Sequence, residues 1–413
     1  MAHQQPADNR EQDGREGAAR MAAYRPIEPS EHRAVAQLMV LGLMVGAKTD
    51  EYVERTEPGE FRVMEEGGEI TSALRLDRQA QWWLGRALPS AQVLQLATPP
   101  QYRGAGHGGR LLAGLLEELH ADGVPLATLT PSTFPFYRAA GFEVAGSWTL
   151  YEARAEHLPK HTAPYRGRPV SLDDPAELAE VYRLVAPSRH GALDRGERFW
   201  RQLPHRTKDK TTAAFVLDGP DGPAGWAVAT LEFRPDPAPF QTRVEVADWG
   251  CLPGADAALY ALFAGYASMN GMVAWSGPDP DPSLYALEDR FARLTDRWHW
   301  MLRLVDLPAA LQARPWPSGV TGQLAFRVSD RLCPWNAGTW RLVLAGGQAR
   351  VEPAPPSTRA ATVDVRGLAS LFTGFAGPDD MVRAGLLDGA GPDDLELLRA
   401  AFASPPPWTA EFY

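Results

Sequence analysis

The chain contains few cysteines and no long apolar run, and these two absences exclude several classes of protein. Only Cys251 and Cys333 occur among 413 residues, so the sequence offers neither a disulfide framework nor a zinc-binding spacing. We expect both thiols to lie inert in a core or loop. No apolar run approaches the roughly 18–20 residues that a membrane-spanning helix needs. We therefore expect no membrane span and no metal site.

The sequence also lacks an excess of positive charge. It has 41 lysines and arginines against 51 aspartates and glutamates, which is a formal net charge of −10. This balance argues against non-specific binding to nucleic acid and is compatible with cationic substrates. Residues 1–20 are polar and lack the apolar centre of a signal peptide. We interpret them as a disordered leader and expect a cytoplasmic protein.

What the chain does have is the length and composition for several folded domains. With 45% hydrophobic and 22% charged residues, it matches soluble globular proteins, and its length predicts two or three domains. The pattern divides into three blocks that mix helices and strands. A stretch at 157–169 is rich in proline, histidine and basic residues, and we interpret it as a linker after the first block.

A glycine-rich stretch, Gln101–Gly109, follows a predicted strand at 92–97 and leads into a predicted helix at 107–121. Four of its residues within six positions are glycines, which let a backbone approach a bulky ligand. The first N–H groups of a helix have no partner within it, so a helix start binds anions, and a pyrophosphate suits it best. The spacing is neither a Walker loop nor a Rossmann fingerprint. Taken alone, the stretch is also compatible with an ordinary flexible loop.

A second buried strand is predicted at 125–130. It should run parallel to the strand at 92–97, because a helix crosses between the two. Adjacent parallel strands that splay apart leave backbone groups unpaired between them. A thioester ligand with a peptide-like arm can fill such a gap by pairing with residues 94–97.

Local signals predict the other elements of the first block. Ser30 is a good N-cap for a helix running to about Leu43. Residues 48–58 read as a polar loop, and the Gly67-Gly68 turn predicts a hairpin. A short helix is expected at 136–140, before the last strand of the block.

The second block repeats the order of elements in the first block, but without its glycine-rich loop. The equivalent stretch, 250–256, reads Gly-Cys-Leu-Pro-Gly-Ala-Asp, without the pattern Gln-x-x-Gly-x-Gly. We interpret the block as a duplicated fold whose second copy has lost its cofactor loop.

The third block begins near Leu302 and predicts a mixed α+β domain that resembles a sterol carrier domain. Its predicted elements are a turn and helix at 303–311, strands at 322–329, 339–345, 348–352 and 361–365, and helices at 366–374 and 392–402. The tail that follows contains three consecutive prolines, which stiffen the chain, and ends in aromatic residues. A tail with such an apolar tip is expected to dock rather than float.

The pattern Gln-x-x-Gly-x-Gly after a strand resembles the coenzyme A pyrophosphate loop of the GNAT N-acetyltransferases. Together with the segment 129–142, the block 303–311 and the terminus Glu411-Phe412-Tyr413, it makes residues 21–413 resemble the Eis (enhanced intracellular survival) family. The resemblance implies a fold of the α+β (mixed α/β) class with tandem GNAT domains, the second degenerate, before a sterol-carrier-like domain. It also implies a homohexamer.

The resemblance assigns boundaries and site residues. The implied domains are an acetyl-CoA-binding GNAT domain at 21–156, a degenerate GNAT domain at 157–300, and a sterol-carrier-like domain at 301–413 whose tail enters the active site. Tyr137 would be the general acid, and the free α-carboxylate of Tyr413 would be the general base. The residues implied to bind acetyl-CoA are Leu94, Gln95, Leu96, Tyr102, Arg103, Gly104, Ala105, Gly106, His107, Ser132 and Thr133.

This sequence departs from the family pattern in two places. It has Thr98 where many GNAT sequences have proline after the strand, and its loop contains the single arginine Arg103 where relatives often have several. For two residues, a purely structural interpretation is also compatible with the sequence. Tyr137, among Phe134, Phe136 and Phe142, could be an aromatic core residue, and His107 could be a solvated loop histidine.

The chemistry can also be argued from the reaction itself. An amine must be neutral to attack a thioester, whereas a lysine-like amine has a pKa of about 10.4. A carboxylate can accept its proton and hold a cationic substrate, while a phenol such as that of Tyr137 can give a proton to the departing thiolate. No covalent enzyme intermediate is needed, and no Ser/His/Asp or Cys/His set stands out.

The sequence therefore predicts an acetyl-CoA-dependent N-acetyltransferase that acts on primary amines of cationic small molecules or peptides. The resemblance suggests aminoglycosides, polyamines or peptide lysines as acceptors, and regulatory protein acetylation would share the same chemistry. The alternative from another class is a protein that binds lipid or another ligand through its sterol-carrier-like domain. That alternative predicts an apolar tunnel within 305–400.

Overall fold

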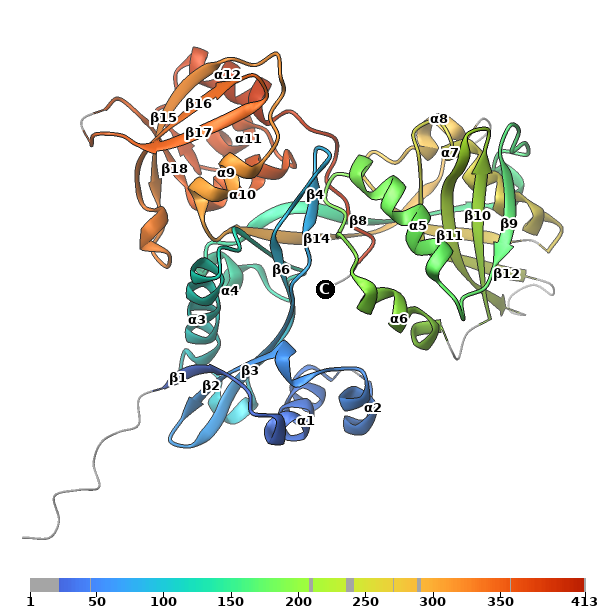
Figure 1. Ribbon diagram of the computed structural model, residues 1–413, viewed down its shortest axis with the longest axis horizontal. Helices are drawn as coiled ribbons and strands as arrows, with labels where there is room; N and C mark the ends of the chain where they lie inside the picture. Colours follow the sequence, from blue (N-terminus) through green and yellow to red (C-terminus); the bar gives the residue numbers. More distant parts are fainter. Residues whose placement is uncertain are drawn as a thin grey trace, which may run out of the picture. The chain divides into compact units, whose positions relative to one another are not determined.

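The computed structural model describes residues 22–44, 46–207, 211–234, 241–269, 271–287, 291–356 and 358–411 (Figure 1). The chain divides into two compact units. One consists of Met1–Leu76 with Gln95–Leu115, and the other of Asp77–Leu94 with Leu116–Tyr413. No helix among the described residues is long and apolar enough to cross a membrane.

The first unit is built on the antiparallel strands β1 (Ala23–Pro26), β2 (Phe61–Glu66) and β3 (Glu69–Asp77). The predicted hairpin turn is confirmed, because Gly67 and Gly68 have φ angles of 64° and 86°, as a two-residue turn between twisted strands requires. Helices α1 (His32–Leu43) and α2 (Thr49–Glu54) pack on these strands. Their shared core consists mainly of Ile27, Val35, Ala36, Met39, Tyr52, Phe61, Val63, Ala73 and Ala97.

Two local predictions in this unit were wrong. Ser30 is not an N-cap but lies inside a 3-10 turn, Pro29–Glu31, before helix α1. The side chain of Glu31 accepts a hydrogen bond from the Glu28 N–H at 2.8 Å and closes that turn instead. The segment expected to be a loop contains helix α2, whose first turn carries two acidic residues. Negative charge stabilises a helix start, which offsets the short apolar face of this helix.

The second unit contains a long mixed sheet with the strand order β6-β7-β14-β8-β13-β12-β11-β10-β9. The strands are β6 (Ser90–Ala97), β7 (Leu126–Leu129), β8 (Glu143–Arg154), β9 (Arg166–Val170), β10 (Thr212–Gly219), β11 (Gly222–Arg234), β12 (Gln241–Cys251), β13 (Met272–Gly277) and β14 (Arg293–Leu304). Strands β6 and β7 are parallel, as predicted, and helix α3 (His107–Ala121) connects them. Strand β8 pairs with both β14 and β13, so the two sequence blocks share one sheet.

Strand β14 was not predicted. The sequence pattern placed no strand at 293–302 and a turn and helix at 303–311. The helix is confirmed as α9 (Leu307–Ala313), whereas residues 293–304 form a 12-residue strand before it. The first half of β14 is exposed and its last five residues are buried, so the strand shows no alternation that would reveal it. Part of the predicted linker is also a strand, since Arg166–Val170 pairs with β10 at the end of the sheet. Pro169 is tolerated there because an edge strand needs fewer backbone donors.

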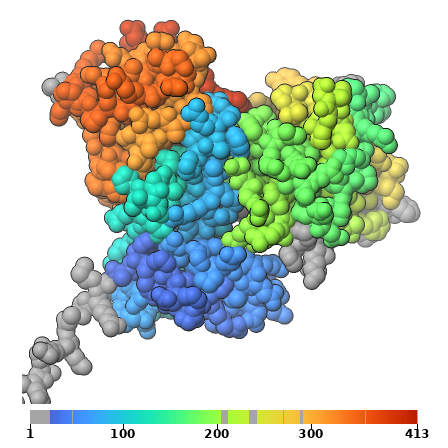
Figure 2. All heavy atoms as spheres, viewed as in Figure 1, coloured from blue at the N-terminus to red at the C-terminus, as the bar shows by residue number. Residues whose placement is uncertain are grey.

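Helices cover both faces of the sheet in the second block. Helix α5 (Ala176–Val185) packs against Trp226 and Val228 of β11, and helix α6 (Glu197–Thr207) joins the same core. The residues between them on that strand, such as Ala227, face the opposite core, which contains helix α7 (Asp256–Ala264). This alternation follows from the period of two in a strand. Figure 2 shows the side chains around α5, in green, at the surface of this block.

The third block forms a separate sheet with the order β17-β16-β15-β18-β19. Its elements are β15 (Gly322–Ser329), β16 (Gly338–Ala345), β17 (Gln348–Pro353), β18 (Ala361–Asp364), helix α10 (Val365–Thr373), helix α11 (Pro378–Arg383), β19 (Leu387–Asp388) and helix α12 (Pro392–Phe402). The predicted strands and both predicted helices are confirmed, while α11 and the short β19 were not predicted. The aromatic side chains Phe326, Phe372 and Phe402 are at most 4% exposed and fill the core between sheet and helices.

Candidate active site

The glycine-rich stretch forms the loop between β6 and α3 in the first unit. Gly104 and Gly106 have φ angles of 84° and 81°, and a Cβ on either would meet no atom within 4 Å. These glycines therefore adopt a left-handed backbone conformation and leave open space around the loop. The first bond of helix α3 joins the Arg110 N–H to the Gly106 carbonyl at 3.1 Å. The N–H groups of residues 107–109 consequently have no acceptor within the helix and are available to an anion.

His107 is anchored rather than solvated, so the interpretation as a solvated loop histidine was wrong. Its side chain is 4% exposed, and its Nδ1 lies 3.0 Å from the Thr71 hydroxyl and 2.8 Å from the guanidinium of Arg110. The imidazole thus ties the first turn of α3 to β3. Tyr102 and Arg103, in contrast, lie at the surface, where the Tyr102 hydroxyl donates to Glu69 and the Arg103 Nε donates to the carbonyl of residue 98 at 3.0 Å.

Strand β6 diverges from β7 as the sequence predicted. The parallel pairing joins Ser90–Gln92 to Leu126–Thr128, although β6 runs on to Ala97. Leu94, Gln95 and Leu96 follow this pairing and are only half-buried, unlike the buried residues on either side of them. Their backbone groups are therefore candidates to pair with a ligand.

Tyr137 lies on helix α4 (Phe134–Ala139), which follows β7 in the second unit. The side chain is 7% exposed and packs edge-on against Phe136 and Phe142, with ring centroids 5.0 and 6.1 Å away. Burial raises the pKa of this phenol, and a hydrogen bond with Ser132 lowers it in part. Tyr137 is thus both a core aromatic residue and a phenol that keeps its proton at neutral pH, as a general acid must. Thr133 occupies the N-cap of the same helix and is exposed.

The C-terminal tail is docked along the second unit as far as it is described. Trp408 is 4% exposed. Its backbone N–H donates to the His190 carbonyl at 2.8 Å, and its backbone forms a parallel bridge with Ser147 of β8. Tyr413, the residue implied to be the base, lies outside the described residues. The prediction that the tail docks is confirmed up to Glu411.

Glu411 ends in a buried cluster of charges that the sequence did not reveal. Its carboxylate accepts a hydrogen bond from the Arg195 Nε at 2.6 Å, and the other two nitrogens of Arg195 donate to Asp248 at 2.7 and 2.9 Å. The Arg195 side chain is 2% exposed and also lies on the rings of Tyr182 and Phe199. No local motif marks these residues, because the three charges come from distant parts of the chain.

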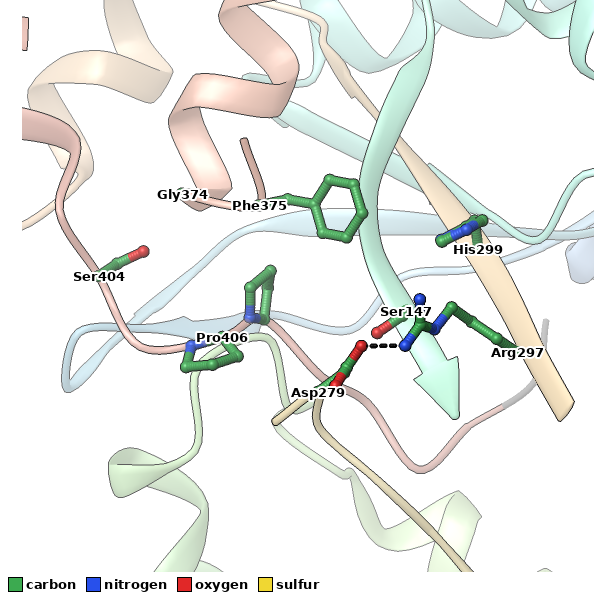
Figure 3. A pocket seen from close by; sticks show the side chains of 9 residues that line it. Ser147, Asp279, Arg297, His299, Gly374, Phe375, Ser404 and Pro406 are labelled. Carbon is green, nitrogen blue, oxygen red and sulfur yellow. Dashed lines mark hydrogen bonds and ion pairs between the residues drawn. The ribbon is translucent and has the colours of Figure 1, made fainter. Parts of the chain in front are cut away.

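The tail also forms one wall of a polar cavity of about 300 Å³ (Figure 3). Ser404 and Pro406 line it from the tail, and His299 lines it from β14. Arg297, on the same strand as His299, forms an ion pair with Asp279. Burial lowers the pKa of His299, so this imidazole is neutral at neutral pH. The Ser404 hydroxyl also donates to the Thr373 carbonyl at 3.0 Å, which constrains the path of the tail before Trp408.

Comparison with known proteins accounts for all three blocks. A model of an acetyltransferase (GNAT) domain matches residues 23–145, another matches 191–304, and a sterol carrier protein domain matches 307–410. An uncharacterized N-acetyltransferase of Streptomyces avermitilis is 27% identical over 340 residues, which cover 78% of this chain and 82% of that protein. One from Streptomyces griseus is 26% identical over 407 residues, covering 87% and 90%. The chain is a GNAT N-acetyltransferase.

Solved structures share the fold of this N-acetyltransferase. A GCN5-related N-acetyltransferase from Anabaena variabilis matches with a TM-score of 0.88 and 27% identity, covering 95% of this chain and all of that one. The fold of Eis1 from Mycobacterium abscessus matches with a TM-score of 0.78 and 22% identity over 95% of this chain. The predicted fold class is therefore confirmed: a mixed α/β protein with two GNAT domains followed by a sterol carrier protein domain.

GNAT acyltransferases use an acyl-CoA, and the loop of this N-acetyltransferase fits such a ligand. The open start of α3 suits a pyrophosphate, and the diverging part of β6 suits a peptide-like arm. Among the described side chains, no group of three or more His, Cys, Asp and Glu residues is arranged to hold a metal ion. Burial raises the pKa of Cys333 to about 11 and raises that of Cys251 well above its usual value, so both thiols are poor nucleophiles, as predicted.

The sterol carrier protein domain of this N-acetyltransferase presents a polar cavity where the alternative function predicted an apolar one. A cavity of about 260 Å³ on this domain is lined by polar and charged side chains, among them Gln323, Arg341, Arg359 and Asp394. Such a lining does not favour a lipid tail. This cavity therefore gives no specific support for lipid binding.

Proposed function

We propose that the protein transfers the acetyl group of acetyl-CoA directly to primary amines of cationic small molecules or lysine side chains. The observation that carries this proposal is the start of helix α3. Its N–H groups at residues 107–109 are free of helical partners, and it follows a loop whose glycines leave open space. The loop Tyr102–His107 would hold the pyrophosphate, and Leu94–Leu96 with Ser132 and Thr133 would line the pantetheine arm.

In this proposal, Tyr137 is the general acid. A thioester supplies an activated acetyl group, and the thiolate that leaves needs a proton. Because burial raises the pKa of the Tyr137 phenol, the side chain keeps its proton at neutral pH. It can then donate a hydrogen bond, and its proton, to the sulfur as negative charge develops there. The hydrogen bond with Ser132 orients the phenol oxygen and moderates this rise.

The general base is the free α-carboxylate of Tyr413. It would accept the proton of the attacking amine and attract a cationic acceptor. The docked tail supports this assignment, since Trp408 and Glu411 are held by buried contacts. The net charge of −10 supports a cationic acceptor, such as an aminoglycoside, a polyamine or a lysine side chain. The resemblance to the Eis family supports a homohexamer, which light scattering would test.

A thiol-release assay with acetyl-CoA and a panel of amines tests the reaction, and Tyr137→Phe tests the acid. The variant keeps the aromatic packing and removes only the hydroxyl. We expect the turnover number to fall at least tenfold, while the Kd for coenzyme A, measured by calorimetry, stays the same. Full turnover in the variant would show that the thiolate takes its proton elsewhere.

Extension of the chain past Tyr413 tests the base. One added glycine converts the α-carboxylate of Tyr413 into an amide and moves the charge by one residue. We expect acetylation to be lost while the Kd for coenzyme A and the thermal midpoint stay unchanged. The same residue added at the N-terminus is the matched control and should have no effect. An extended chain that is fully active would contradict the assignment of Tyr413.

A further inference from the structure

The second GNAT copy keeps a gap between its central strands and fills it with side chains. Strands β12 and β13 are parallel and pair over Arg243–Val246, although β12 runs on to Cys251. Beyond the pairing, the indole of Trp249 on β12 donates to the carbonyl of Ser276 on β13 at 2.6 Å. This side chain thus bridges the diverging strands at the point where, in the first copy, the backbone of β6 is left available.

The C-terminal tail packs against this filled gap. The ring of Trp408 lies 5.5 Å from that of Trp249 and belongs to the same buried core of the second copy. The guanidinium of Arg189 lies over the Trp408 ring at 3.8 Å, a favourable cation–π geometry. On the other side Gly191 has a φ of 98°, and a Cβ there would lie 3.2 Å from the backbone of Trp408. The second copy is therefore shaped to receive the tail of its own chain.

An ion pair near the end of the tail completes this attachment. Arg195 donates one hydrogen bond to Glu411 at 2.6 Å and two more to Asp248 of β12, which hold the guanidinium in place. Burial alone would raise the pKa of Asp248, but the charge and hydrogen bonds of Arg195 outweigh it and lower that pKa. The carboxylate that orients Arg195 therefore stays ionised at neutral pH.

Such a pair is better suited to fixing a position than to stabilising the fold. Removing two charges from water costs about as much as their attraction returns, whereas the fork of an arginine fixes a carboxylate in direction and distance. Glu411 is two residues before Tyr413, and two residues span at most about 7 Å. A fixed Glu411 therefore limits where the terminal carboxylate can lie.

We propose that Arg195 is a positioning residue for acetyl transfer: the second GNAT copy holds Glu411 through Arg195 and thereby places the α-carboxylate of Tyr413. This inference rests on the proposed role of that carboxylate as the base. The degenerate copy would thus contribute to catalysis without binding a cofactor.

Glu411→Gln tests this inference with little risk to folding, because it changes one atom in the tail. In the full chain we expect the turnover number to fall at least tenfold, with the KM for acetyl-CoA and the thermal midpoint unchanged. Carboxypeptidase should release Tyr413 faster from the variant than from the native chain. Arg195→Lys keeps the charge and should retain more activity than Arg195→Met. Arg399→Gln, which breaks the exposed pair with Asp379, is the control and should behave like the native protein.

A chain that lacks Tyr413 separates this inference from the proposed function. If the deletion abolishes activity and Glu411→Gln has no further effect on the residual rate, the inference stands. If the deletion abolishes activity but Glu411→Gln and Arg195→Met are fully active in the intact chain, the inference fails and the proposed base stands. If Glu411→Gln lowers the residual rate of the shortened chain by the same factor, Glu411 acts independently of the terminal carboxylate and the inference fails. If the shortened chain is fully active, the proposed base fails, and the inference fails with it.

Discussion

The two GNAT copies of this protein share a fold and differ in what occupies the gap between their central parallel strands. In both copies the strand before the connecting helix runs several residues beyond its pairing, from Gln92 to Ala97 in β6 and from Val246 to Cys251 in β12. In the first copy Leu94, Gln95 and Leu96 of this extension are half-buried, and their backbone groups are candidates to pair with a ligand. In the second copy Trp249 bridges the strands and the tail packs beside it. The divergence thus belongs to the topology, whereas its use depends on a few side chains.

The starts of the two connecting helices differ in the same way. Helix α3 begins with His107, Gly108 and Gly109, without an acidic residue in its first turn. Helix α7 begins with Asp256, whose carboxylate occupies the electrostatic position that an anion would take. The loop before α7 also uses its N–H groups internally, since that of Leu252 donates to the Ala224 carbonyl at 2.7 Å. The second copy could therefore not bind a pyrophosphate in the manner proposed for the first.

The largest effect is expected from an acidic residue placed at the start of α3, as Asp256 stands at the start of α7. The quantity affected is the Kd for coenzyme A. In Gly109→Asp the new Cβ would meet no atom within 4 Å, so the side chain starts in open space. Its charge would repel a phosphate at short range and raise the Kd for coenzyme A about tenfold or more. The helix itself should not be destabilised, because an acidic residue is favourable in a first turn. Calorimetric titration and a thermal melt would measure the two effects separately.

Asp256→Asn in the second copy is the matched control for Gly109→Asp. It should leave the Kd for coenzyme A unchanged, because that helix start is not part of the proposed site. A large effect of Asp256→Asn, or none of Gly109→Asp, would mean that the ligand is held elsewhere.

A smaller effect is expected from a pair of glycine substitutions. Gly106 of the first loop and Gly254 of the second have φ angles of 81° and 91°. A Cβ at either position would meet no atom within 4 Å. Alanine at either position should cost about 1–2 kcal/mol of backbone strain, with similar losses in thermal stability. Only Gly106→Ala should also raise the Kd for coenzyme A, by several-fold, because only that loop holds the ligand. Equal effects on binding would show that the two loops do not differ in function.

Much of the fold could be predicted from the sequence because its signals are local. The Gly67-Gly68 turn, the helix at 107–121 and the parallel strand that follows depend on turn chemistry and hydrophobic periodicity. Strand β14 could not be predicted in this way, because its neighbours β7 and β8 are distant in sequence and its burial changes halfway along. Helix α2 was missed because its polar composition hides a single buried residue, Tyr52.

The residues of the candidate site also differ in whether a local sequence signal marks them. The loop and Tyr137 could be proposed from the sequence because they lie in contiguous motifs. Arg195 and Asp248 were not, because an isolated arginine and an isolated aspartate carry no signal until folding brings them together. His107 was found as a loop residue, but its side chain was misread, since the contact with Thr71 joins residues 36 positions apart.

The smallest expected effect is on the pH dependence of the free energy of unfolding. It comes from His190, in the segment that contacts the C-terminal tail. His190 of that segment is 5% exposed, hydrogen-bonded through Nε2 to the Thr373 carbonyl at 2.9 Å and through Nδ1 to the Leu84 N–H at 3.3 Å. These bonds require a neutral ring, and burial lowers its pKa from 6.5 to about 4. Above pH 6.5 the ring is neutral in both the folded and the unfolded chain, so it adds no pH dependence.

Between pH 6.5 and 4 the unfolded chain binds a proton at His190 that the folded chain does not. The free energy of unfolding should therefore fall as the pH falls, by at most about 1.4 kcal/mol per unit from this residue. The thermal midpoint of the native protein, followed by tryptophan fluorescence, should drop between pH 7 and pH 5. In His190→Gln, which cannot titrate, the drop should be smaller, although the variant is less stable at pH 7. A drop of equal size in both proteins would mean that other groups govern the acid sensitivity, and that the second copy holds the tail independently of His190.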